Sequence, residues 1–297
     1  MKTHLKINAV ILAVTVLVLV TSVLSLADNI YVSSYNYEYP FNDGLGNIYK
    51  FDSSGTRTTF ASGLHGPIGL AFDSSGNLYT TNFNNGTIEK FDTSGNGTIF
   101  ASGLNDPVGI VFDSSGYLYV AHQNIGTIEK FDTSGNGTIF ASGLEYPAGL
   151  AFDSSGYLYA ANSKTGTIEK FDTSGNGAIF ASGLDDPVGL AFDSSGYLYV
   201  ANQHIRTIEK FDTSGNGTIF ASGLNDPAGL AFDSSGNLYV TNSLLYFGTI
   251  EKFDSSGNRS LFASGLRYPV CIATQIPEPA TLLLLGLGAV IIRKFRA

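Results

Sequence analysis

Short runs of apolar and β-branched residues recur along most of the chain and are separated by turn residues. In one representative stretch, the runs are 107–112, 117–121, 127–131 and 138–142, all rich in Val, Ile, Thr, Tyr and Phe. Runs of this length and composition, bounded by Gly, Asn, Asp and Ser, predict β-strands. No apolar spacing of 3.6 residues, which would indicate helices, is found outside the two termini. The body of the chain is therefore predicted to be all-β.

The four-run unit repeats with a period of 40 residues. Phe-Asp-Ser-Ser-Gly begins at Phe72 and recurs at 112, 152, 192 and 232. A second Phe-Asp series begins at Phe51 and recurs at 91, 131, 171, 211 and 253, the last step being longer because of an insertion at 244–247. Four short strands in about 40 residues are typical of one blade of a β-propeller.

The two ends of the repeat region predict how the ring closes. Residues 29–34, 47–51 and 57–62 match only the second, third and fourth strands of a blade. The missing first strand is found at 268–273, which matches the Pro-Val-Gly-Leu-Ala runs. The sequence thus predicts a six-bladed β-propeller of four-stranded blades over 28–274, closed by pairing of a C-terminal strand with the N-terminal blade. Closure removes the sheet edges that would otherwise be exposed.

The N-terminal segment predicts export. Lys2 and Lys6 precede the apolar stretch 7–26, and Ser25-Leu26-Ala27 is a small-x-small cleavage site. This pattern predicts a signal peptide over 1–27. The apolar stretch is also long enough to span a bilayer, which needs about 20 residues. An uncleaved N-terminal anchor is therefore the alternative.

The C-terminal segment 275–297 has three parts in order: Pro277-Glu278-Pro279, an apolar run over 280–292, and a basic end. The apolar run is shorter than the ~20 residues of an ordinary span. It predicts a short membrane segment with its basic end on the cytoplasmic side. The arrangement closely resembles the PEP-CTERM sorting signal of bacterial envelopes. This resemblance implies export, recognition by envelope sorting machinery and removal of the tail by a membrane protease. A plain C-terminal membrane anchor is the alternative.

Composition narrows the classes of partner. Charged residues make up 14% of the chain, and the formal net charge is −9. Without the two terminal segments, 11 basic and 24 acidic residues remain, a net charge of −13. Nucleic acid is therefore not an expected partner. The single cysteine, Cys271, excludes an internal disulfide framework and a multi-cysteine zinc site. We expect a monomer without a resident cofactor.

The repeats carry a recognisable pattern. At 187–202 it reads Pro-x-Gly-Leu-Ala-x-Asp-x-x-Gly-x-Leu-Tyr-Val-Ala-Asn, followed by Thr-Ile-x-x-Phe. This pattern resembles NHL repeats. The resemblance implies a six-bladed propeller that acts mostly as a binding platform for protein, RNA or glycan. Some relatives of the same shape are metal-dependent lactonases or lyases.

Differences between the near-identical units concentrate in two loops. One loop joins the second and third strands, and the other precedes the first strand. In an antiparallel blade these loops share one face, while the uniform turns lie on the other. Divergence restricted to one face predicts a binding surface there, although free drift of surface loops is the alternative. The candidate binding residues in these loops are Asp106, Tyr146, Asp185, Asp186, His204, Arg206 and Asp226.

The residue at the end of each second strand is also a candidate. We expect these side chains to ring the mouth of the central channel, where lactonases of similar shape hold a divalent metal with Glu, Asn and Asp. Calcium sites normally include carboxylates, and this ring has none, so we expect no metal and assign the Asn side chains to strand-end capping. His122 is a weak candidate for the general base of a lyase. The ring consists of Asn82, His122, Asn162, Asn202 and Asn242.

These observations favour an exported recognition or scaffold module that binds a glycan or an envelope protein on the variable-loop face. An enzyme of lactonase or lyase type, with Ca²⁺ at the channel mouth, is one alternative. A purely structural matrix protein is the other. The Glu-Lys pairs of each Thr-Ile-Glu-Lys run are expected to be solvated.

Overall fold

The computed structural model describes residues 28–35, 45–244 and 247–275. Within it, Asn29–Gln275 form one compact unit. The predicted signal peptide, the apolar tail with Pro277-Glu278-Pro279, and the tyrosines at 37 and 39 lie outside the described residues. In the part of the chain that the structure describes, no helix is long and apolar enough to cross a membrane.

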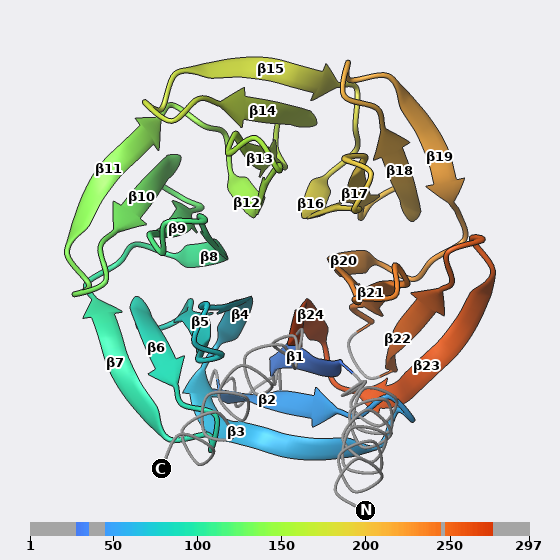
Figure 1. Cartoon of the computed structure of the whole chain (residues 1–297), viewed down its shortest axis with the longest axis horizontal. Coiled ribbons are helices and arrows are strands. Elements are labelled where there is room, and N and C mark those ends of the chain that lie inside the picture. The colour runs from blue at the N-terminus through green and yellow to red at the C-terminus, as the bar shows by residue number, and fades with distance from the viewer. Residues whose placement is uncertain (1–27, 36–44, 245–246, 276–297) are drawn as a thin grey trace, which may run out of the picture. The chain divides into compact units, whose positions relative to one another are not determined.

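Six antiparallel sheets of four strands each stand in a ring around a central channel (Figure 1). We number them as blades 1 to 6 in chain order. Blade 1 contains β24 (Pro269–Gln275), β1 (Asn29–Tyr35), β2 (Leu45–Phe51) and β3 (Arg57–His65). Blade 2 contains β4 (Pro67–Phe72), β5 (Leu78–Asn82), β6 (Thr87–Phe91) and β7 (Gly97–Ser102). Blade 3 contains β8 (Pro107–Phe112), β9 (Leu118–His122), β10 (Thr127–Phe131) and β11 (Gly137–Ser142).

The other three blades repeat this order from the inner to the outer strand. Blade 4 contains β12 (Pro147–Phe152), β13 (Leu158–Asn162), β14 (Thr167–Phe171) and β15 (Gly177–Ser182). Blade 5 contains β16 (Pro187–Phe192), β17 (Leu198–Asn202), β18 (Thr207–Phe211) and β19 (Gly217–Ala221). Blade 6 contains β20 (Pro227–Phe232), β21 (Leu238–Asn242), β22 (Gly248–Phe253) and β23 (Arg259–Leu266).

Ring closure is confirmed. The C-terminal strand β24 pairs antiparallel with β1, with Thr274 opposite Ile30 and Ile272 opposite Val32. Blade 1 therefore takes its inner strand from one end of the chain and its other three strands from the opposite end. The predicted blade number and strand order are both confirmed.

Aromatic side chains hold neighbouring blades together. The Tyr79 ring lies edge-on to Phe100 of its own blade at 5.2 Å and to Phe112 of the next blade at 4.9 Å. Edge-to-face pairs of this kind contribute about 0.5–1.5 kcal/mol beyond the area that they bury. Blade 6 keeps only the contact within the blade, Tyr239 to Phe262, because β24 carries Thr274 where the other inner strands end in Phe. The equivalent tyrosines of the remaining blades are Tyr31, Tyr119, Tyr159 and Tyr199.

Hydroxyl groups tie the inner strands together on one half of the ring. Thr81 Oγ1 accepts a hydrogen bond from the Gly69 amide at 2.8 Å and donates to the Val108 carbonyl of the next blade at 2.7 Å. Thr241 in blade 6 and Ser33 in blade 1 make equivalent links. Blades 3, 4 and 5 have alanine at this position, namely Ala121, Ala161 and Ala201.

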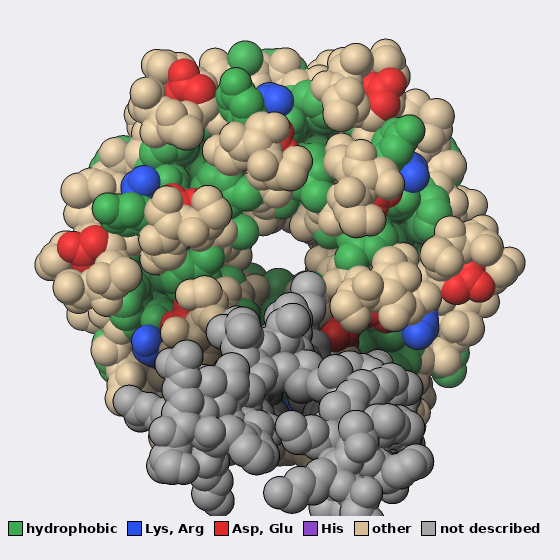
Figure 2. Space-filling view, viewed as in Figure 1, with side chains coloured by type: hydrophobic (Ala, Val, Ile, Leu, Met, Phe, Trp, Pro, Cys, Tyr) green, Lys and Arg blue, Asp and Glu red, His purple; other side chains and the backbone are tan. Residues whose placement is uncertain are grey.

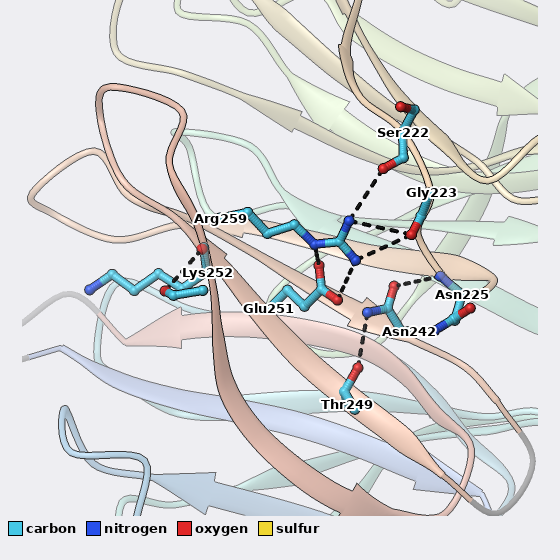
Figure 3. A network of polar contacts seen from close by, with 9 residues as sticks. Ser222, Gly223, Asn225, Asn242, Thr249, Glu251, Lys252 and Arg259 are labelled. Carbon is cyan, nitrogen blue, oxygen red and sulfur yellow. Dashed lines mark hydrogen bonds and ion pairs between the residues drawn. The ribbon is translucent and has the colours of Figure 1, made fainter.

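The Glu-Lys pairs are less exposed than expected. Lys90 lies over the ring of Tyr79, with its Nζ 5.1 Å from the ring centroid and 3.6 Å from an Asp73 carboxylate oxygen. Glu89 accepts a hydrogen bond from Asn82. In blade 6 the equivalent Glu251 is only 8% exposed and binds Arg259, whose guanidinium also donates to main-chain carbonyls of the preceding blade (Figure 3). These charges therefore stabilise the packing within and between blades.

The uniform Asp-x-Ser-Gly-Asn turns depend on ionised carboxylates. Asp172 Oδ1 accepts from the amides of Ser174 and Asn176 at 2.9 and 3.0 Å, and its Oδ2 accepts from the Asn176 side chain. These hydrogen bonds, the one from the Asn176 side chain first, hold the pKa of Asp172 below its ordinary value of 3.8. The same arrangement lowers the pKa of Asp92, Asp132, Asp212 and Asp254.

These turns predict acid sensitivity. A carboxyl whose pKa is lower in the folded than in the unfolded protein stabilises the folded state at any pH above its unfolded pKa. This stabilisation is lost as the pH falls through the pKa of the folded state. We expect the Tm from circular dichroism to be nearly constant between pH 7 and 5 and to fall below about pH 4. The double variant Asp172→Asn, Asp212→Asn keeps an acceptor for the two turn amides, loses the acceptor for the Asn176 or Asn216 side chain, and cannot titrate, so its Tm falls less in acid. An equal fall in the variant would show that these turns do not carry the effect.

Candidate functional site

The two variable loops of each blade meet on one face of the ring. In blade 2 the amide of Phe83 donates to the carbonyl of Gly66 at 2.9 Å, and the amide of Asn84 donates to that of His65 at 3.1 Å. Blade 5 repeats the first contact between Gln203 and Asp186 at 3.0 Å. The loop after the second strand is therefore fastened to the loop before the first strand. We call this set of loops, 65–66 with 83–86 and their equivalents, the variable-loop face.

The residue before each inner-strand proline has an unusual backbone conformation. These residues have positive φ angles in all six blades, between 39° and 68°, a conformation uncommon for residues other than glycine. Each turns its carbonyl toward the amide of the partner loop, which accounts for the hydrogen bonds above. Five of the six are not glycine, so their side chains are held in a fixed direction. The six residues are Gly66, Asp106, Tyr146, Asp186, Asp226 and Tyr268.

Arg206 is the most strained residue of this face. Blades 2, 3 and 4 have a glycine at the equivalent position, with φ of 63–64°, and a Cβ there would lie 2.2 Å from a leucine carbonyl oxygen. Arg206 has the same conformation, φ 62°, and its carbonyl accepts the same hydrogen bond, from Leu224. Its side chain is 60% exposed, with Nε 3.8 Å from Asp226 Oδ1.

The strand-end Asn and His side chains lie inside the blades. Asn82 is 1% exposed, and its amide donates to Thr87 Oγ1 at 3.2 Å and to Glu89 Oε2 at 3.3 Å. Asn162 and Asn202 repeat these contacts. Asn242 keeps the contact with the equivalent threonine, Thr249, while the equivalent glutamate, Glu251, binds Arg259 (Figure 3). The variable-loop end of the channel is lined not by this ring but by the next residues along the chain, Phe83, Gln123, Gln203 and Ser243.

His122 takes the place of asparagine in blade 3. It is 2% exposed, with Nδ1 3.1 Å from the Asn105 carbonyl and Nε2 2.9 Å from Glu129 Oε2. Both ring nitrogens therefore contact acceptors of the same blade. A general base needs a nitrogen within hydrogen-bond distance of its substrate, and His122 has its two nitrogens occupied away from the channel.

The charged candidates of the variable-loop face are grouped in pairs. His204 Nδ1 lies 3.4 Å from Asp185 Oδ1, and Asp106 contacts Asn124. Burial raises the pKa of Asp186, and burial followed by the nearby Asp226 and Asp186 raises that of Tyr268. Asp186, Asp226 and Tyr268 hold the same position, before the inner-strand proline, in three consecutive blades.

Exposed apolar side chains lie in the variable loops as well as on the outer strands, where one position of blades 2 to 6 carries Ile99, Ile139, Ile179, Ile219 and Leu261. Phe247 is 78% exposed, Ile125 53% and Ile205 49%. The positions equivalent to the two isoleucines are Asn85 and Thr165. The binding residues predicted from the sequence were charged or aromatic and did not include Ile125 and Ile205. An isoleucine among otherwise polar loop residues could have indicated these two positions.

A channel of about 710 Å³ runs through the centre of the ring, and its opening is visible in Figure 2. Its wall is formed by the inner strands β4, β8, β12, β16, β20 and β24. Among the described residues, no group of three or more His, Cys, Asp and Glu side chains is arranged to hold a metal ion.

Comparison with protein families identifies the C-terminal end. Residues 275–296 match the PEP-CTERM protein-sorting motif, which confirms the predicted sorting signal and marks the chain as an exported protein of the bacterial envelope. Comparison with curated protein sequences gave no match.

Solved structures share the fold at low sequence identity. The propeller in a nidogen/laminin complex is 20% identical, with a TM-score of 0.73, and the match covers 85% of this chain and all of that one. Virginiamycin B lyase from Staphylococcus aureus is 16% identical, with a TM-score of 0.62, covering 79% and 85%. A gluconolactonase from Xanthomonas campestris is 18% identical, with a TM-score of 0.59, covering 69% and 76%. At these identities the likeness shows the six-bladed fold alone.

The strain at Arg206 predicts a stabilising substitution. We expect Arg206→Gly to raise the free energy of unfolding by about 1 kcal/mol. The substitution relieves the strain of a non-glycine residue in the left-handed conformation, and the greater freedom of glycine in the unfolded chain offsets part of this gain. The reverse change at the equivalent position, Gly166→Arg, is expected to lower it. Thermal and urea unfolding measure both. A destabilised Arg206→Gly variant would mean that the arginine is held by favourable contacts.

Proposed function

We propose that this exported propeller is a recognition module that binds a protein of the envelope or extracellular matrix through its variable-loop face. The observation that carries the proposal is the exposure of Phe247, Ile205 and Ile125 in loops that differ between otherwise near-identical blades. Phe and Arg side chains surrounded by polar groups are common at the centres of protein interfaces. Protruding aliphatic side chains of this kind fit a protein partner better than a hydroxyl-rich glycan.

Rigidity of the face supports the same function. The left-handed residues before the prolines, and the hydrogen bonds between the paired loops, hold the side chains in place before binding. Preorganised loops lose little conformational entropy on association. The propeller in the nidogen/laminin complex, which shares the fold, comes from a structure of two proteins bound to each other.

A glycan is the second candidate ligand, and one observation favours it. Tyr146 is 43% exposed, with Lys164 Nζ 5.5 Å from its ring centroid and Lys164 paired to Glu145 at 2.8 Å. An exposed tyrosine beside paired charges offers a surface on which a sugar ring stacks. This platform lies in blade 4, whereas the exposed phenylalanine lies in blade 6, so the two candidates are separable by mutation.

A lyase or lactonase activity requires different residues. The lyase alternative takes His122 as its general base, so His122→Asn, which installs the residue found in four other blades, would abolish such an activity. A recognition module retains its binding in this variant, and its binding does not change when a chelator is added.

The proposal predicts which substitutions abolish attachment. The double variant Ile205→Asn, Phe247→Ser is expected to reduce binding of the labelled protein to the surface of cells lacking the gene by at least about tenfold, the effect of losing two central contacts. The matched control is Ile179→Asn, because Ile179 is 61% exposed on the outer strand β15, away from the variable loops. The single variant Tyr146→Ser is the test of the glycan candidate.

Flow cytometry of the labelled cells gives the readout, with circular dichroism to establish that each variant is folded. Loss of binding in the Ile179→Asn control, or full binding by the double variant, would overturn the assignment of the variable-loop face. Loss of binding in Tyr146→Ser alone would indicate that the ligand is a glycan and not a protein.

A further inference from the structure

The central channel is not used by recognition on the variable-loop face, yet it has the size and wall of a ligand site. Its volume of about 710 Å³ lies within the roughly 300–1,000 Å³ range of small-molecule pockets. We propose that the channel binds a slender, uncharged aliphatic molecule with a terminal hydroxyl group. This inference does not depend on the proposed partner of the loop face.

Aliphatic side chains line much of the channel wall. Each inner strand contributes one such residue directly after its proline, and the six differ in size. The two alanines lie in blades 4 and 6 and leave room beside the larger valines and isoleucine. Apolar walls of this kind hold water poorly and favour apolar ligands. The six residues are Ile68, Val108, Ala148, Val188, Ala228 and Val270.

Main-chain polar groups along this wall are bonded within the protein on half of the ring. The hydroxyl of Thr81 joins the Gly69 amide to the Val108 carbonyl, and Thr241 joins the Gly229 amide to the Val270 carbonyl. Ser33 makes the third link. Backbone groups bonded in this way have less need of water in the channel.

The wall is also preformed. A Cβ placed on Gly109, Gly149 or Gly189 would lie within 2.2 Å of a carbonyl oxygen of the next inner strand. The inner strands therefore approach each other as closely as glycine permits, which fixes the width of the channel. A ligand would enter an existing cavity and would not have to open one.

The two ends of the channel have different chemistry. One end is lined by phenylalanines of the inner strands, Phe72, Phe112, Phe152 and Phe192. The end at the variable loops is lined by Gln123, Gln203, Tyr35 and Tyr268, whose side chains carry amide and hydroxyl groups. This polarity orients an aliphatic chain toward the phenylalanines with its hydroxyl group among the amides.

Carboxylates near the polar end select against anions. Asp186 and Asp226 directly precede the prolines that begin β16 and β20, the position that Tyr268, a residue of the channel wall, has before β24. A carboxylate head group placed there would be repelled by both. An alcohol of the same chain length is not subject to this repulsion.

The test compares 1-octanol with octanoate as probes of the full protein, using saturation-transfer NMR and titration. We expect saturable octanol binding, weaker octanoate binding, and at least about tenfold weaker octanol binding to Ala148→Phe, which fills the channel beside the valines. The matched control is Ala178→Phe, in the exposed outer strand β15 of the same blade. Equal octanol binding by both variants would place the octanol on the outer surface and overturn the proposal.

Cys271 supplies a second readout on the unmutated protein. It is the single cysteine of the sequence, it lines the channel, and burial raises the pKa of its thiol to about 11. We expect octanol at saturation to slow the reaction of Cys271 with methyl methanethiosulfonate at pH 9 by at least about fivefold, because an occupied channel excludes the reagent. Mass spectrometry of the modified protein measures the rate. An unchanged rate at a concentration that saturates the NMR signal would also overturn the proposal.

Discussion

The pairing of β24 with β1 is the constraint on which the remaining structure depends. In five blades the tyrosine packs against the inner strand of the next blade as well as against its own blade, as Tyr79 does against Phe112 and Phe100, so an open ring would leave one blade without a neighbour. Closure by strand pairing joins the two ends of the propeller and creates both the channel and the two faces. The strand that closes blade 1, β24, also contacts blade 6, where a hydrogen bond from the Thr274 hydroxyl to the Phe232 carbonyl stands in place of the aromatic contact between blades.

Repetition separates stability from recognition in this molecule. The Asp-centred turns are nearly the same in every blade because each one satisfies its own backbone amides with a carboxylate, as Asp172 does. The loops on the opposite face share the same backbone arrangement, with residues of positive φ and amide-to-carbonyl hydrogen bonds between paired loops, while their side chains differ from blade to blade. Arg206 departs from this frame, since it occupies a glycine position at a steric cost, and it lies in the blade next to the exposed Phe247.

Much of this architecture can be predicted from the sequence, because each repeat contains recognisable strand and turn residues. The 40-residue period and the displaced first strand at 268–273 predict six blades and their closure, which the strand pairing confirms. The divergent loops and the sorting motif are equally visible. The contacts that the sequence does not predict are those with the neighbouring blade. The Thr81 hydroxyl, for example, donates a hydrogen bond to the Val108 carbonyl of the next blade, and the strand pattern of residues 78–82 does not reveal this contact.

The candidate site shows a similar limit. Asn82 was expected at the channel mouth because it ends a strand, but its side chain points toward Glu89 within the blade, and the next residue, Phe83, lines the channel. The direction of a strand-end side chain depends on the register of the pair, which a single sequence does not specify. The positive φ of Tyr146 could likewise not be predicted, because tyrosine is not a usual choice for that conformation.

The most direct test of the central claim is site-specific photocrosslinking in the producing cells. A photoreactive amino acid is placed at position 247 or 205 in the variable loops, and at position 179 or 139 on the outer strands, all strongly exposed sites. The account predicts a discrete crosslinked product of higher mass from the loop positions and none from the outer-strand positions. The same product from both sets, or products from the outer strands alone, would contradict a binding surface on the variable-loop face.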